Sequence, residues 1–76
     1  MAKKQLRHTP SMLINNLRDV QGLFLNFVLK NGAVQLLQLD GYVDKKFILK
    51  DAMHHKIILH LQDIDEIWQD VTIDQT

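Results

Sequence analysis

The sequence predicts a mainly β domain with one N-terminal α-helix, and three observations support this fold class. Asn31-Gly32 separates two stretches in which apolar residues alternate with others, as in a β-hairpin. Apolar residues before this hairpin recur at helical spacing. Several expected strands are apolar on both faces, which fits a curled sheet that closes into a small barrel, or a sheet whose edges pair with neighbouring subunits.

The helix is expected over residues 10–21. Thr9 has the chemistry of an N-cap, and Pro10 suits the first helical position, where its missing N–H costs nothing. The helix should end at Gly22, and its apolar positions are Leu13, Ile14, Leu17 and Val20. A helix this short is not stable alone, so we expect it to lie on the sheet that follows.

Five strands are expected after the helix, over residues 23–30, 33–40, 46–50, 56–61 and 64–70. The Asn31-Gly32 pair should connect the first two through a type I′ turn, because both residues readily adopt positive φ. We expect one domain that extends over residues 9–71. A flexible N-terminus over residues 1–8 should precede it, and a tail over residues 72–76 should follow it.

The length of 76 residues makes this single domain marginally stable by itself. A domain of this size buries only about 60% of the surface that its unfolded chain exposes. The chain has no cysteine, so it has neither a disulfide framework nor a thiolate metal site to compensate. Oligomerisation is the remaining usual remedy, and the hydrophobic fraction of 46% agrees with an interface between copies.

The formal net charge is zero, whereas most nucleic-acid binders carry a basic excess. The charges are nevertheless segregated: basic residues lie early (Lys3, Lys4, Arg7, Arg18) and acidic residues lie late (Asp63, Asp65, Glu66, Asp70, Asp74). A basic face beside an acidic edge is therefore compatible with the composition. The first ten residues lack the apolar core of a signal peptide and no apolar run approaches membrane-spanning length, so we expect a cytoplasmic protein without a membrane partner.

Two clusters of titratable residues have the composition of catalytic or metal sites. His54, His55 and His60 lie near Asp51 and Asp63, but a set of solvated turn histidines explains them better, because no zinc-ligand spacing is present. The acidic cluster of Asp63, Asp65 and Glu66 has the composition of an acid–base pair, but a solvated turn is the better interpretation. We therefore expect no enzymatic activity, no metal and no cofactor.

Two other groups of residues suit RNA. Lys45 and Lys46 lie beside Tyr42, which offers cations and an aromatic ring for stacking; a polar loop with a packed tyrosine is an equally good interpretation. Asn15 and Arg18 on the helix could contact bases and phosphates, although a solvated helix face is the simpler explanation.

Three motifs resemble those of the Sm-like family, and most closely its bacterial Hfq RNA chaperones. Ile14-Asn15-Asn16-Leu17-Arg18 is similar to the Leu-Asn-x-Leu-Arg pattern of the Hfq helix, and Leu29-Lys30-Asn31-Gly32 is similar to its Leu-x-Asn-Gly strand end. The stretch from Tyr42 to Ile48 is similar to the aromatic-Asp-Lys/Gln-aromatic turn, with one residue inserted. The resemblance covers residues 11–68.

This resemblance implies a short helix and five strongly bent antiparallel strands that close an Sm-like barrel, with protomers joined strand to strand into a ring, a homohexamer. It also implies binding of single-stranded U-rich or A-rich RNA, such as a small regulatory RNA or an mRNA. The function would be to promote RNA–RNA pairing in post-transcriptional regulation. The RNA contacts that it implies are Asn15, Arg18, Gly32, Tyr42, Lys45, Lys46, His60 and Gln62.

The chain departs from the family pattern at several of these places. The Tyr-Lys-His-Ala-Ile signature is matched only by His60-Leu61-Gln62-Asp63-Ile64, in which Leu61 replaces the lysine. Lys46 stands where the family has an aromatic residue, as does Val28 on the opposite face, and Leu37 replaces a glycine. Two alternatives therefore remain: an Sm-fold protein-interaction module without RNA binding, and an unrelated small β-barrel subunit with a structural role.

Overall fold

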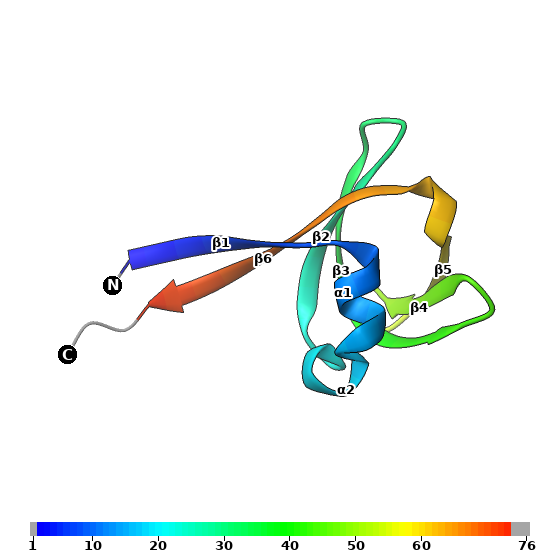
Figure 1. Ribbon diagram of the computed structural model, residues 1–76, viewed down its shortest axis with the longest axis horizontal. Coiled ribbons are helices and arrows are strands. Elements are labelled where there is room, and N and C mark those ends of the chain that lie inside the picture. Colours follow the sequence, from blue (N-terminus) through cyan, green and yellow to red (C-terminus); the bar gives the residue numbers. More distant parts are fainter. Residues whose placement is uncertain (1, 74–76) are drawn as a thin grey trace.

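The computed structural model describes residues 2–73, and the side chains of residues 4–71 (Figure 1). Its fold is mainly β, as predicted. Eight elements precede the last strand: β1 (Ala2–His8), α1 (Pro10–Asn15), α2 (Leu17–Val20), β2 (Phe24–Leu29), β3 (Val34–Val43), β4 (Lys46–Lys50), β5 (Lys56–His60) and the short 3-10 helix η1 (Leu61–Asp63). The last strand is β6 (Ile64–Ile73).

The six strands form one antiparallel sheet in the order β1-β6-β2-β3-β4-β5. The five strands expected after the helix correspond to β2–β6. The sheet bends strongly, but the expected closed barrel is wrong, because β1 and β5 lie at its two edges (Figure 1). The reason lies in η1, which carries the chain from β5 across the open end of the sheet to a place beside β2. Consequently β5 and β6 are adjacent in sequence without pairing.

The core fills the concave side of this bent sheet. Its buried residues come from the inward-facing positions of β2, β3, β4 and β6 and from the two helices: Leu13, Val20, Leu25, Phe27, Leu37, Leu39, Phe47, Leu49, Ile64 and Ile67. The rings of Phe27 and Phe47 lie 6.3 Å apart between centroids at its centre. On the edge strand β5, by contrast, the inward-facing Ile57 and Leu59 are only half-buried.

The expected single helix over residues 10–21 is in fact two short helices. Its start is as predicted, because the Thr9 hydroxyl accepts a hydrogen bond from the Met12 backbone N–H at 3.2 Å. The break occurs at Asn16, whose side-chain amide donates to the Met12 carbonyl at 3.0 Å. Such local side-chain bonds compete with helix continuation. Within the described residues, neither helix is long and apolar enough to cross a membrane.

The hairpin at Asn31-Gly32 is confirmed, but the predicted type I′ turn is wrong. The loop has three residues, because Leu29 N–H bonds the Ala33 carbonyl at 2.8 Å and Gly32 N–H bonds the Leu29 carbonyl at 2.9 Å. Gly32 adopts positive φ (92°), whereas Asn31 does not. The Asn31 side chain instead accepts the Ala33 N–H at 2.9 Å, which stabilises the longer loop.

The N-terminus differs most from expectation. The stretch expected to be flexible forms β1, which pairs with β6 from Ala2↔Ile73 to His8↔Ile67. β6 also continues beyond its expected end at residue 70, and the remaining residues of the expected tail, 74–76, lie outside the described residues. Where β6 no longer pairs with β2, β1 and β6 form a two-stranded ribbon that extends away from the rest of the protein (Figure 1).

Candidate nucleic-acid site

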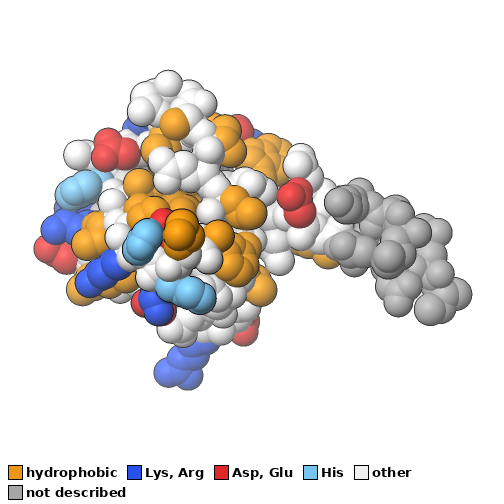
Figure 2. Space-filling model, turned by 180° about the vertical axis from the view of Figure 1, so that it is seen from behind, with side chains coloured by type: hydrophobic (Ala, Val, Ile, Leu, Met, Phe, Trp, Pro, Cys, Tyr) orange, Lys and Arg blue, Asp and Glu red, His pale blue; other side chains and the backbone are white. Residues whose placement is uncertain are grey.

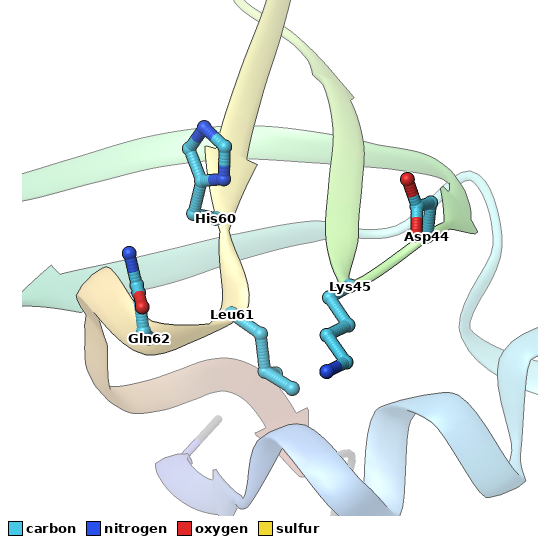
Figure 3. Close-up of a pocket in the computed structure, with 5 residues that line it drawn as sticks. All are labelled: Asp44, Lys45, His60, Leu61 and Gln62. Carbon is cyan, nitrogen blue, oxygen red and sulfur yellow. The ribbon is translucent and has the colours of Figure 1, made fainter.

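A hollow of about 490 Å³ lies where the β3–β4 turn meets the end of β5 (Figure 3). Its lining residues are Asp44, Lys45, His60, Leu61 and Gln62, and we call it the Lys45 hollow. Lys45, His60 and Gln62 were all singled out from the sequence. The fold therefore brings together three candidate residues from two segments of the chain.

Backbone geometry fixes this meeting of segments. The Lys45 carbonyl accepts the Leu61 N–H at 2.9 Å, which ties the β3–β4 turn to the start of η1. Asp44 and Lys45 form a two-residue turn with φ values of 49° and 60°. Left-handed backbone costs non-glycine residues roughly 1–2 kcal/mol each. The paired strands on either side hold the turn in this conformation, which is that of a type I′ hairpin.

The side chains of the hollow fall into two groups. In Figure 3 those of Lys45 and Leu61 converge, whereas His60 and Gln62 extend away from that pair on the side of β5 and η1. Lys45, His60 and Gln62 are exposed, and Leu61 is half-buried. Within the described residues no hydrogen bond or ion pair engages the three polar side chains. A cation, an imidazole and an amide are thus available to a ligand within one hollow.

Lys46 extends this group of polar residues. It lies directly opposite His60 in the β4–β5 register, so the two side chains share one face of the sheet. Figure 2 shows Lys and His side chains gathered over the end of the body away from the β1–β6 ribbon, among hydrophobic ones. Asp44 lines the same hollow, and its negative charge partly offsets the positive charge of Lys45.

Tyr42 lies elsewhere. Its ring packs against the buried Phe47 with centroids 5.0 Å apart, and it does not line the Lys45 hollow. The packed tyrosine, one of the two interpretations of the sequence, is therefore what the structure contains. Asp44 and Leu61 also line the hollow, although neither was a candidate from the sequence; the only available indication was their position beside Lys45 and His60.

The remaining candidates occupy separate places. Asn15 and Arg18 line a second hollow of about 440 Å³ at the junction of α1 and α2, and both are exposed. Gly32 lies at the tip of the β2–β3 hairpin, where its positive φ shapes the loop. The structure thus places a cation and an amide together on the helices, but it gives Gly32 a conformational role.

Asp51 and Glu66, from the other titratable clusters, have structural partners. Asp51 accepts the backbone N–H groups of Met53 and His55, both at 2.9 Å, and its carboxylate lies 3.3 Å from the His55 ring. The His55 N–H is the main reason why the pKa of Asp51 is lowered. Glu66 pairs with Arg7 at 3.2 Å and accepts the Trp68 indole N–H at 3.1 Å. In the described part of the chain, no group of three or more His, Asp or Glu residues is arranged to hold a metal ion.

Models of known protein families, curated proteins and solved structures were compared with this chain, and none of them matches it. The assignment of a function therefore depends on the geometry of the Lys45 hollow and on the motifs that form it.

Proposed function

We propose that this chain is an Sm-like, Hfq-like RNA chaperone that binds single-stranded U-rich or A-rich RNA and promotes pairing between RNAs in post-transcriptional regulation. The observation that carries the proposal is that Lys45, His60 and Gln62, all exposed, line one hollow. The order of one helical segment followed by five bent antiparallel strands, β2–β6, agrees with the resemblance found in the sequence.

Each group at the hollow suits one part of a single-stranded RNA. Lys45 and Lys46 attract phosphates, and the release of counterions supplies most of that affinity. The His60 ring offers a surface on which a base can stack, and the Gln62 amide can both donate to and accept from a base edge. The mechanism is binding and alignment of strands, without covalent chemistry.

One copy offers too few contacts for tight binding, which is why the proposal includes a homo-oligomeric ring, with six copies as the resemblance implies. Several identical sites on one ring would hold a single RNA by multivalent binding. The edge strand β5 supports such assembly. Its outer side has no neighbouring strand among the described residues, and Ile58 is 48% exposed. An apolar open edge favours pairing with another chain.

The test replaces two cations. In the Lys45→Ala/Lys46→Ala double variant, we expect weaker binding to fluorescent oligo-U. The slope of log K against log salt should become shallower by about 1.4, because each phosphate contact on a single strand contributes about 0.7. The matched control is Lys50→Ala/Lys56→Ala, which removes the same charge from the opposite end of the β4–β5 pair. Unchanged affinity in the first variant, or an equal loss in both, would remove the Lys45 hollow from the proposal.

A second candidate function is a protein-interaction module without RNA binding. The specific observation in its favour is the apolar outer face of β2 and β3, where Phe24, Val34 and Leu36 are 46%, 60% and 56% exposed. Such a patch is typical of protein contacts. Filter binding with homopolymeric RNA separates the two: no retention of poly-U or poly-A, together with self-association in solution, would favour the module.

A further inference from the structure

The strand β1 occupies an edge of β6 that would otherwise be open. β2 pairs with β6 from Ile64 to Trp68, and β1 pairs with the other side of β6 from Ile67 to Ile73. The overlap of the two neighbours is therefore confined to Ile67 and Trp68. β1 is attached to the rest of the sheet through β6 alone.

β1 contributes little to the core. Its described side chains from Lys4 to Arg7 are exposed, and His8 is half-buried. The side-chain contacts that hold it are Arg7 to Glu66 at 3.2 Å, Gln5 to Asp70 at 3.1 Å and His8 to Gln69 at 2.9 Å. The first two of these pairs are exposed and stabilise weakly, and a two-stranded ribbon is marginal by itself. β1 is therefore held mainly by its backbone hydrogen bonds and can be displaced.

The charges of the strands are complementary. β6 and the residue before it carry acidic side chains (Asp63, Asp65, Glu66, Asp70), whereas β1 carries the basic Lys4 and Arg7. The opposite edge of the sheet is also basic, because β4 and β5 carry Lys46, Lys50 and Lys56. β1 therefore resembles β5 in the sign of its charge. The charges of β1 repel a β5 strand from another copy, whereas the charges of the β6 edge that β1 covers attract it.

We propose that β1 competes within its own chain with the β5 strand of a second copy for the β6 edge, so that β1 must leave before copies join. This inference rests on the ring assembly proposed above. A ring of identical copies needs a contact between two different edges of the sheet. With β1 in place, both edges are basic; with β1 released, the acidic β6 edge meets the basic β5. The pairing also covers the half-buried Ile57 and Leu59 and the exposed Ile58.

This competition sets the strength of assembly. When only a fraction of copies has β1 released, the apparent dissociation constant rises by the inverse of that fraction. If one copy in ten is open, the dissociation constant is about tenfold higher than in a chain whose β1 is always displaced.

The first test locks β1 in the full chain with Leu6→Cys and Gln69→Cys, which are direct partners in the register. The chain has no other cysteine, so oxidation and reduction of the same protein give the closed and open forms. In sedimentation velocity over a concentration series, we expect the oxidised form to associate at least about tenfold more weakly than the reduced form. A free-thiol assay establishes that the disulfide has formed.

The second test uses Arg7→Glu, which places a like charge beside Glu66 and so weakens the attachment of β1 without a disulfide. We expect this variant to associate several-fold more tightly than the unchanged chain. Lys4→Glu is the matched control, because it changes the same charge on the other face of β1, where no ion pair exists among the described residues. It should associate clearly less tightly than Arg7→Glu.

The outcomes separate this inference from the function on which it rests. Equal association of the oxidised and reduced forms, or weaker association of Arg7→Glu than of the unchanged chain, would overturn the competition and leave the ring possible. No association in any form would overturn both the competition and the ring. RNA binding at the Lys45 hollow is judged separately by the lysine variants.

Discussion

The left-handed turn at the Lys45 hollow allows a prediction in which stability and binding change in opposite directions. Lys45 has a φ of 60°. For a residue with a Cβ this conformation costs roughly 1–2 kcal/mol, which glycine does not incur. Glycine loses about 0.4–1 kcal/mol more conformational entropy on folding. We therefore expect Lys45→Gly to raise the free energy of unfolding by about 0.5–1 kcal/mol, the difference between these two effects.

Urea unfolding followed by the fluorescence of Trp68, the only tryptophan, measures this change at one fixed protein concentration. For a urea m value of about 1 kcal/mol per M, the midpoint should rise by about 0.5–1 M. Lys45→Ala is the control, because alanine keeps the left-handed cost and should leave the midpoint near its original value. Both variants should bind oligo-U more weakly, since both remove the cation.

Gly32→Ala is the converse change, because it introduces a Cβ at a residue with positive φ. Gly32 has a φ of 92°, and a Cβ added there would meet no atom within 4 Å, so the cost is that of the backbone alone. The entropy that alanine saves in the unfolded chain offsets part of this cost, so the midpoint should fall by about 0.5–1 M, equivalent to roughly 0.5–1 kcal/mol. A lower midpoint in Lys45→Gly, or an equal rise in Lys45→Ala, would refute the argument from backbone strain.

Three further changes test other parts of the fold. Phe47→Ala removes a fully buried ring that packs on Phe27 and Tyr42; a loss of about 3–5 kcal/mol, as large as the stability of many domains this small, should abolish the β-sheet circular dichroism signal. Thr9→Ala removes the N-cap that accepts the Met12 N–H and should cost about 1 kcal/mol in urea unfolding, whereas Thr9→Ser should retain most of it. The pKa of Asp51 is lowered from its ordinary value of 3.8, chiefly because the His55 N–H donates to the carboxylate. This contribution to stability is present above the unfolded pKa and is lost as the pH falls through the folded pKa. The urea midpoint should therefore drop when the pH falls below the ordinary pKa of 3.8, and it should drop less in Asp51→Ala. Equal drops in both proteins would contradict this.

The parts of the fold that depend on neighbouring residues were predictable from the sequence. The Asn31-Gly32 hairpin and the Thr9-Pro10 helix start are local, because the side chains that stabilise them lie within a few residues. The break at Asn16 is local as well, yet asparagine is tolerated within many helices, so the pattern alone does not reveal it.

Features that depend on distant segments were not predictable. Ala2–His8 has no apolar alternation, and it becomes a strand because β6 presents an open edge more than fifty residues away. Whether the barrel closes depends on the path of η1, which no periodicity encodes. Tyr42 illustrates the same limit at the site: the register shift between Leu39 and Gly41 changes which residues of β3 face inward, and so turns the tyrosine towards Phe47.

The zero net charge is compatible with RNA binding once the charges are placed in the fold. The cations of β4, β5 and the Lys45 hollow lie at one side of the sheet, whereas the acidic residues of β6 lie next to β1 at the other. Arg7 on β1 directly neutralises one of those acids, Glu66. Distant acidic residues are screened by salt and do not cancel the positive potential near the lysines. An RNA strand at the hollow would therefore experience the charge of the local lysines and not the net charge of the protein. Once β1 has left, the acidic edge of β6 is available for the basic edge of another copy, so a single segregation of charge serves both RNA binding and assembly in the proposed mechanism.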